Sequence, residues 1–373
     1  MPKKVAYKAQ IEHLQILDEN GKLDEKLAKG TLKDEQVVAL CEHIILCRHY
    51  DEIAFKLQRS GRMGTYPQNK GQEAIAATAM AVTRNDWMVP CYRENSALFL
   101  HGLPMEHILL HWMGDERGNQ IPEDVNVMPI SIPIGTHMLH ATGIAWAKKL
   151  QKTDHVALTY FGDGATSEGD FHEAMNFATV MKAPCVFICQ NNQWAISVPR
   201  EKQMASETVA QKGLAYGANC IQVDGNDVFA VYKATKDAVN KARKDGSVTL
   251  IETLTYRMGD HTTADDARRY RDLKELEAWA KRDPLLRIQK YLSAKGLWDD
   301  KKEAAAEAGA KERVAQIVKN CENIAKPSTD DIFDYTFATL PDDLRAQRDT
   351  MRTNSLSLEP EQATLTQREA QHA

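Results

Sequence analysis

The 373-residue sequence lacks the long hydrophobic runs of a membrane protein, and none of its apolar stretches approaches the roughly 20 residues that a spanning helix needs. It also lacks an excess of positive charge, because 47 Lys and Arg against 52 Asp and Glu give a formal net charge of −5. That balance argues against a surface for nucleic acids. The N-terminus has no apolar core and carries acidic residues. We therefore expect neither a secretory signal nor a transit peptide, but a cytoplasmic protein.

Cysteine motifs of the metal-binding or redox type are absent as well. The seven cysteines are an odd number and include no CxxC pair, so we expect reduced thiols buried in the core. His107 and His111 have the spacing of helical metal ligands, but Ile108 stands where the zinc-peptidase motif requires glutamate. We predict a packed helix there and no zinc site.

The most informative segment that is present runs from Val156 to Ser197. An apolar run (156–161) leads into a Gly-Asp-Gly turn, an amphipathic helical segment follows, and a second apolar run (185–189) ends at two asparagines. This pattern predicts a β-α-β unit, and a right-handed crossover makes its two strands parallel. Asp163 and Asn192 then lie at the carboxyl ends of the two strands, which is the edge of an open α/β sheet where ligands bind.

Strand-like and helical segments alternate over roughly residues 130–258, which indicates an α/β fold with a doubly wound, mostly parallel sheet and helices on both faces. We expect one α/β domain over residues 34–340, with a helical part from about 273 to 340. Residues 1–33 resemble an arm that lies on a partner, and 341–373 form a polar C-terminal tail. The predicted elements include helices over 34–59, 71–82 and 136–150 and a long strand over 248–258.

Three interpretations of the Gly-Asp-Gly turn compete. A dinucleotide site needs a third glycine nearby and an acidic residue after the second strand, whereas the next glycine is Gly169 and Gln190-Asn191-Asn192 follows that strand. A plain surface turn explains the glycines but neither Asp163 nor the asparagines. A Mg²⁺–diphosphate site explains all of them, because Mg²⁺ takes oxygen ligands from a few protein groups and from phosphate. Ser167 and Asp170 also have capping-box spacing, which predicts a helix N-terminus that points toward the site.

Motifs along the chain extend this interpretation to a family. The Gly-Asp-Gly turn with its following Asn-Asn is the signature of thiamine diphosphate enzymes. From about residue 34 to 340 the chain resembles the α subunit of the E1 component of pyruvate and branched-chain 2-oxoacid dehydrogenase complexes, a family with the thiamine diphosphate-binding fold. The resemblance is carried by GQEA (71–74), Tyr92-Arg93-Glu94, GNQ (118–120), EKQ…SETVAQK (201–212), IQVDGND (221–227) and DHTTADD…RYR (260–271).

The resemblance implies roles for individual residues. Asp163, Asn192 and the main-chain oxygen of Trp194 match the Mg²⁺ ligands, although the family usually has tyrosine at the last position. Tyr92 and Arg93 match contacts of the diphosphate. The other positions that match cofactor contacts are Gly164 and Ala165 beside the diphosphate, Ile134 as the apolar support of the bent cofactor, and Ile132 next to it.

The active-site loop of the family corresponds to the polar segment after the last predicted strand. His261 matches the loop histidine near the diphosphate and the reacting carbon, and Tyr270 and Arg271 belong to the same loop. The resemblance therefore implies catalytic roles for His261, Tyr270 and Arg271.

The resemblance also implies the activity and the partners. Such a subunit uses thiamine diphosphate and Mg²⁺ to decarboxylate a 2-oxoacid, and the acyl group passes to the lipoyl group of the E2 acyltransferase. The cofactor is activated by a glutamate of the E1 β subunit, so we expect an α₂β₂ heterotetramer that is inactive without β. Pyruvate is the expected substrate, with branched-chain 2-oxoacids as the alternative and acetoin third. An NAD-binding oxidoreductase and a non-catalytic binding subunit remain as alternatives of other classes.

Overall fold

The computed structural model describes residues 3–326, 328–334 and 337–354 of the chain. It divides into two compact units, Met1–Lys319 and Asn320–Ala373. Among the described residues of the first unit, six parallel strands form one sheet in the order β1-β7-β8-β4-β3-β2. The strands are β1 (His13–Leu14), β2 (Trp87–Val89), β3 (Ala157–Gly162), β4 (Cys185–Asn191), β7 (Asn219–Asp224) and β8 (Thr249–Leu254). A small antiparallel hairpin, β5 (Trp194–Ala195) and β6 (Val198–Pro199), follows β4.

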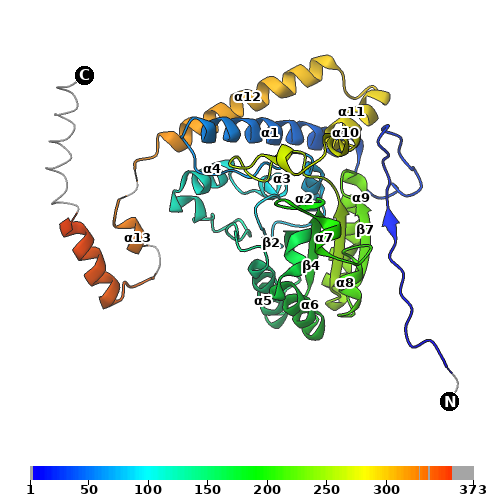
Figure 1. Cartoon of the computed structure of the whole chain (residues 1–373), viewed down its shortest axis with the longest axis horizontal. Helices are drawn as coiled ribbons and strands as arrows, with labels where there is room; N and C mark the ends of the chain where they lie inside the picture. The colour runs from blue at the N-terminus through cyan, green and yellow to red at the C-terminus, as the bar shows by residue number, and fades with distance from the viewer. Residues whose placement is uncertain (1–2, 327, 335–336, 355–373) are drawn as a thin grey trace. The chain divides into compact units, whose positions relative to one another are not determined.

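Helices cover both faces of this sheet (Figure 1). The α-helices of the first unit are α1 (Asp34–Arg59), α2 (Ala77–Met80), α3 (Asn95–His101), α4 (Met105–Met113), α5 (Thr136–Leu150), α6 (Gly169–Met181), α7 (Arg200–Gln203), α8 (Gln211–Leu214), α9 (Val228–Asp245), α10 (Leu273–Ala280) and α11 (Pro284–Ala294). Helix α12 (Asp300–Glu322) spans the boundary between the units, and α13 (Asp331–Asp334) belongs to the second. No helix of the described residues is long and apolar enough to cross a membrane.

The two faces of the sheet have separate cores because successive residues of a strand point to opposite sides. Phe161 and Phe187 project to the face covered by α5 and α6, where Phe161 packs against Phe171 with ring centroids 5.7 Å apart. Tyr160 projects to the opposite face, where its hydroxyl lies 2.9 Å from Thr78 Oγ1 of α2. The doubly wound, parallel α/β fold expected from the sequence is confirmed.

The element boundaries show where the sequence prediction held. The helices over 34–59 and 136–150 have the predicted ends. The helix predicted over 71–82 is instead a 3-10 turn (η1, Glu73–Ala76) followed by the single turn of α2, since Gly71 (φ +96°) packs directly against the backbone of Tyr256. The strand predicted over 248–258 ends at Leu254, level with the end of its neighbour β4 at Asn191, and further on Met258 N bonds to Lys70 O in a loop. Helix α6 begins at Gly169, and no side chain of the predicted capping box caps it.

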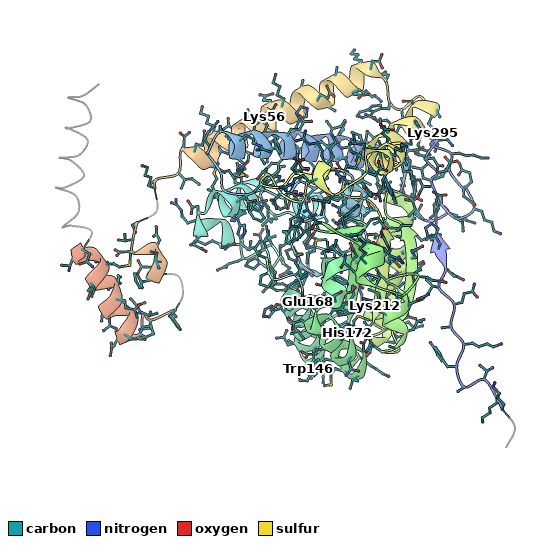
Figure 2. All side chains as sticks on the ribbon, viewed as in Figure 1. Lys56, Trp146, Glu168, His172, Lys212 and Lys295 are labelled. Atoms are coloured by element: carbon teal, nitrogen blue, oxygen red, sulfur yellow. The ribbon has the colours of Figure 1, made fainter. Side chains whose placement is uncertain are left out.

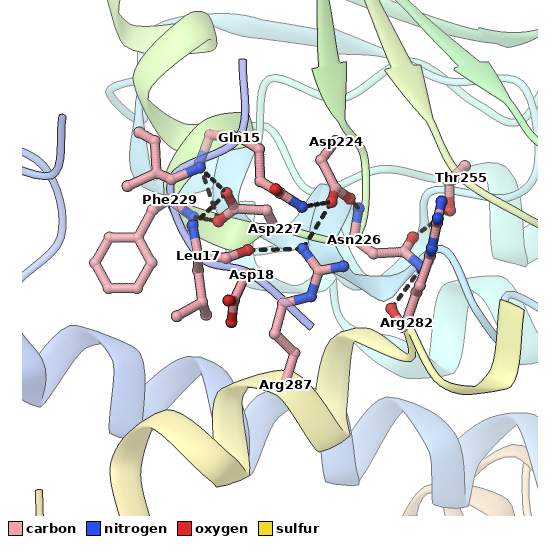
Figure 3. Close-up of polar contacts among 12 residues, drawn as sticks. Gln15, Leu17, Asp18, Asp224, Asn226, Asp227, Phe229, Thr255, Arg282 and Arg287 are labelled. Atoms are coloured by element: carbon pink, nitrogen blue, oxygen red, sulfur yellow. Dashed lines mark hydrogen bonds and ion pairs between the residues drawn. The ribbon is translucent and has the colours of Figure 1, made fainter. Parts of the chain in front are cut away.

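Part of the predicted N-terminal arm belongs to the sheet of its own chain. β1 pairs with β7, and the buried Asp227 carboxylate accepts the main-chain N–H groups of Ile16 (2.6 Å) and Leu17 (2.8 Å). The same carboxylate caps α9. Arg287 reaches the network from α11 and donates to Asp224 Oδ2 and to Leu17 O, both at 2.8 Å (Figure 3). The sequence did not indicate this because a two-residue strand leaves no periodic pattern.

Candidate active site

A cavity lies at the carboxyl edge of the sheet, where β2, β3, β4 and β8 end. It brings together residues from segments that are far apart in the sequence. The sequence-predicted residues that line it are Tyr92, Arg93, Ile134, Asp163, Gly164, Ala165, Asn192, Trp194 and His261.

Asp163 follows the last residue of β3 and is almost completely buried, with an exposed fraction of 1%. Its Oδ2 accepts a hydrogen bond from Gln203 Nε2 at 3.1 Å, whereas its Oδ1 has no partner among the described residues. Burial raises the pKa of Asp163 to about 6, because the charged form is poorly solvated there. A buried carboxylate oxygen without a partner is costly, and a bound cation would offset that cost.

Gly164 makes the close packing around Asp163 possible. A Cβ atom at this position would lie 2.7 Å from Ala195 Cβ in the β5–β6 hairpin. The turn is also held from α8, since Lys212 (labelled in Figure 2) donates from Nζ to Thr166 O at 3.0 Å and to Thr166 Oγ1 at 2.7 Å. The backbone beside Asp163 is therefore fixed on two sides.

Asn192 leaves the adjacent strand at the same edge, because the register of β3 and β4 pairs Gly162 with Gln190. The Asn192 side chain is buried; its Nδ2 donates to Gln72 Oε1 at 3.0 Å, and its Oδ1 accepts from Trp194 N at 3.2 Å. The hairpin then brings Trp194 to the cavity, and its main-chain oxygen accepts from Arg257 Nη1 at 3.4 Å.

These three residues offer one carboxylate, one amide oxygen and one carbonyl oxygen. Among the described residues, no group of three or more His, Cys, Asp or Glu side chains is arranged to hold a metal ion. A site of mostly neutral oxygen ligands suits Mg²⁺ that also binds phosphate, because Mg²⁺ usually takes few protein carboxylates. The donor set and the unpartnered Asp163 Oδ1 thus fit a Mg²⁺–diphosphate group.

Two buried guanidinium groups add positive charge to the cavity. Arg93 follows β2 and donates from Nη1 to Gln68 O at 2.6 Å and from Nη2 to His261 Nδ1 at 3.1 Å. Arg257 follows β8 and donates to Ile196 O at 2.7 Å, while its Nε is buried without a partner among the described residues. Burial, together with Arg93, lowers the pKa of Arg257 to about 10. Because these hydrogen bonds go to neutral acceptors, the charge of both groups is available to an anion such as a diphosphate.

His261 lies between the two arginines. Its Nδ1 is 3.1 Å from Arg93 Nη2 and 3.4 Å from Arg257 Nη1, so Nδ1 is the acceptor and we assign the proton to Nε2. Burial, reinforced by both arginines, lowers the pKa of His261 to about 3. The main-chain N–H of His261 donates to Asp265 Oδ2 at 2.8 Å, which holds the loop. His261 is therefore a neutral imidazole whose Nε2–H can donate a hydrogen bond.

Further residues line the cavity that were given no site role from the sequence: Gln72, Cys91, Glu94, Gly162, Gln190, Ala195, Ile196 and Arg257. Glu94 is buried, which raises its pKa to about 7, and it accepts from Arg93 N at 2.7 Å and from Gln190 Nε2 at 3.2 Å. The rule that identified Asp163 and Asn192, polar groups just past a buried strand, could also have identified Arg257. Glu94 and Gln72 have roles that only tertiary contacts reveal.

Three sequence-predicted residues do not line the cavity. Ile132 is half exposed on the surface. The Tyr270 hydroxyl donates to Asp265 and accepts from Arg257 Nη2 at 2.9 Å. The Arg271 guanidinium donates to main-chain carbonyls of the same loop, among them Met258 O at 3.1 Å. Tyr270 and Arg271 thus fix the loop that carries His261, because their polar side-chain atoms form hydrogen bonds within and beside that loop.

Comparisons with known proteins agree with this geometry. A family model described as the dehydrogenase E1 component matches residues 42–330. Two similar proteins are both named pyruvate dehydrogenase E1 component subunit alpha, one from Staphylococcus aureus (strain Mu50 / ATCC 700699) and one from Staphylococcus epidermidis (strain ATCC 12228 / FDA PCI 1200). Each is 42% identical over 341 residues, which cover 91% of this chain and 92% of the relative.

Proposed function

The chain belongs to the dehydrogenase E1 component family, and from this premise we propose that it is the α subunit of a thiamine diphosphate-dependent pyruvate dehydrogenase E1. In this role it takes part in decarboxylating pyruvate and transferring the acetyl group to the lipoyl group of an E2 acyltransferase. The observation that carries the proposal is the unpartnered Oδ1 of buried Asp163, in a cavity that also contains Asn192 and two arginines. The bacterial origin of the relatives supports a cytoplasmic location.

The residues of the cavity fit thiamine diphosphate with Mg²⁺. Asp163, Asn192 and the carbonyl of Trp194 would hold the cation, and Arg93 and Arg257 would bind the diphosphate. When bound, thiamine diphosphate supplies the electron sink that decarboxylation of a 2-oxoacid requires.

The chain's own contribution is binding, orientation and placement of a proton. Burial of both arginines strengthens their attraction to an anion, because charges removed from bulk water are screened less. The neutral His261 places a donor, Nε2–H, beside the same groups without adding a third positive charge. We propose that it donates to the diphosphate or to the reacting carbonyl during turnover.

A β subunit is proposed as partner because the described residues that line the cavity leave no carboxylate for activating the cofactor. The carboxylates among the described lining residues are Asp163, in the proposed cation site, and Glu94, whose oxygens accept main-chain and glutamine N–H groups. Apolar side chains that are more than 40% exposed also occur near the cavity, among them Ile132, Ile196 and Val198, as expected for a surface that a second chain covers.

Co-expression tests the proposal. The chain produced with an E1 β subunit should form a complex, expected to be α₂β₂, that decarboxylates pyruvate and acetylates a lipoyl domain. The chain alone should be inactive, and full decarboxylase activity of the chain alone would contradict the proposal.

The substrate is tested separately. The names of the relatives support pyruvate, whereas the sequences GDGATSEGD (162–170) and NNQWAIS (191–197) resemble branched-chain enzymes. The ratio of kcat/KM for pyruvate and for 3-methyl-2-oxobutanoate in the assembled enzyme distinguishes the two. Calorimetry with thiamine diphosphate and Mg²⁺, compared with NAD, tests the oxidoreductase alternative.

A further inference from the structure

Two glutamine side chains hold the two side chains of the proposed cation site, Asp163 and Asn192. The glutamines themselves are not proposed cation ligands. Gln72 precedes η1, and Gln203 is the last residue of α7. Gln72 accepts from Asn192, and Gln203 donates to Asp163. Gln72 is thus an acceptor and Gln203 a donor. Each hydrogen bond occupies one atom of its partner and leaves an oxygen of that partner available to a cation.

Gln203 distinguishes the two oxygens of the Asp163 carboxylate. Its Nε2 donates to Oδ2 at 3.1 Å and is also 3.3 Å from Val198 O, which ties the amide to the β5–β6 hairpin. Because Oδ2 is occupied, Oδ1 is the oxygen left without a partner among the described residues. The amide thus selects one carboxylate oxygen for the cation while adding no charge.

Gln72 and the main-chain N–H of Trp194 together determine the orientation of the Asn192 amide. The two ends of a carboxamide have nearly the same shape, so the hydrogen-bond partner decides which end points where. Gln72 Oε1 requires a donor, and therefore Asn192 presents Nδ2 to it and turns Oδ1 away. Gln72 is almost fully buried, and its Nε2 has no partner among the described residues of this cavity.

The turn that carries Gln72 is itself rigidly held. The buried Glu73 carboxylate accepts Gly71 N at 2.9 Å and forms an ion pair with Arg48 of α1 at 2.7 Å. Arg48 also pairs with Asp283 at 2.7 Å, ahead of α11. The position of the Gln72 acceptor is therefore set by the packing of α1 and α11 and not by a free loop.

We propose that Gln72 and Gln203 are positioning residues that fix the cation-facing oxygens of Asn192 and Asp163, and so set the affinity and selectivity for Mg²⁺. The inference rests on the proposed function, because it assumes a divalent cation bound with a diphosphate. Groups that orient metal ligands in this way typically contribute about 10- to 100-fold to metal affinity. Loosely held ligands should weaken Mg²⁺, which requires near-octahedral geometry, more than the more tolerant Ca²⁺.

The test uses the full chain assembled with its β subunit in the presence of thiamine diphosphate. Mn²⁺ binding is followed by the EPR signal of free Mn²⁺, and Mg²⁺ and Ca²⁺ are then titrated as competitors. Gln72→Leu and Gln203→Leu should each weaken Mn²⁺ binding by about 10- to 100-fold and lower the Mg²⁺/Ca²⁺ selectivity ratio. Gln72→Glu retains an acceptor for Asn192 Nδ2 and should recover much of the affinity that Gln72→Leu loses.

Gln222→Leu is the matched control. Gln222 lies in β7, bonds to His13 and does not line the cavity, so its removal should leave Mn²⁺ affinity and selectivity unchanged. A wild-type complex that binds no Mn²⁺ would overturn the proposed function. Wild-type binding that Gln72→Leu and Gln203→Leu leave unchanged would overturn this inference alone. An unchanged selectivity ratio in complexes of lowered thermal stability would show a merely structural role and overturn it as well.

Discussion

Two aspartates at the carboxyl edge of the same sheet, Asp163 and Asp227, invite comparison. Both are buried, each lies just past a strand, and burial raises the pKa of each to about 6. Asp227 accepts four main-chain N–H groups, from Ile16 and Leu17 and from Phe229 and Ala230. Asp163 accepts one side-chain N–H on Oδ2 and leaves Oδ1 without a partner among the described residues.

The difference separates a carboxylate that holds the fold from one that is available to a ligand. At Asp227 four hydrogen bonds offset part of the cost of burial, and the carboxylate ties the N-terminal segment to α9. At Asp163 the cost of burial is only partly offset within the described chain, and a bound cation would offset the rest. Both aspartates lie at the sheet edge, so their position does not distinguish them. The number of carboxylate oxygens that have hydrogen-bond partners does, and it indicates which of the two is available to a ligand.

Removal of the Asp163 charge should have the largest effect. Asp163→Asn keeps the size of the side chain but removes the anionic ligand, so metal affinity should fall by more than about 100-fold, beyond the effect of groups that only orient ligands. Activity should be lost, while thermal stability changes little because a buried charge is removed. Calorimetric titration of thiamine diphosphate and Mg²⁺ into the assembled complex measures the affinity. Mg²⁺-dependent binding that Asp163→Asn retains would contradict a cation-binding role that distinguishes Asp163 from Asp227.

His261→Ala should separate binding from turnover within the cavity. His261 bonds to Arg93 and is neutral, so its loss should change the affinity for the cofactor only slightly. Turnover should fall by about 100-fold if Nε2–H donates in the reaction. Steady-state kinetics and calorimetry on one preparation measure the two effects. An equal loss of both would show that His261 acts only by shaping the cavity.

Asp227→Asn is the counterpart of Asp163→Asn and should have the reverse effect. The amide cannot accept four N–H groups, so the free energy of unfolding should fall by about 1–3 kcal/mol. Metal affinity should stay at the wild-type value, because Asp227 does not line the cavity. Thermal unfolding and Mn²⁺ titration provide the two readouts, and lowered metal affinity at full stability would be the contrary result.

The pH dependence of stability should show a smaller effect. The folded-state pKa of Asp227 is about 6 and lies above its ordinary value of 3.8. The folded protein therefore binds more protons between these values, and the contribution of Asp227 to stability is present at low pH and lost as pH rises from about 4 to about 6. The wild-type curve should carry this slope and Asp227→Asn should lack it in thermal melts across that range. If stability changed with pH equally in the wild type and in Asp227→Asn, the raised pKa would not belong to Asp227.

The sequence predicted those features of the fold and of the candidate site that have a local signal. Helices α1 and α5 follow from amphipathic spacing, and Asp163 and Asn192 follow from their place after apolar runs. The 3-10 turn at Glu73 was missed because contacts of Gly71 with the segment after β8 override helix propensity. Tyr270 was grouped with His261 because they share a loop, yet only tertiary geometry shows that its hydroxyl binds Asp265 and Arg257.

The central claim is that the cavity at Asp163 binds thiamine diphosphate through a divalent cation. A crystal structure of the assembled complex with thiamine diphosphate and Mn²⁺, with anomalous diffraction recorded for manganese, tests it most directly. We expect a single manganese peak in this cavity, coordinated by Asp163 Oδ1, Asn192 Oδ1, the Trp194 carbonyl and the diphosphate. A manganese peak elsewhere, or a diphosphate bound away from Arg93 and Arg257, would contradict it.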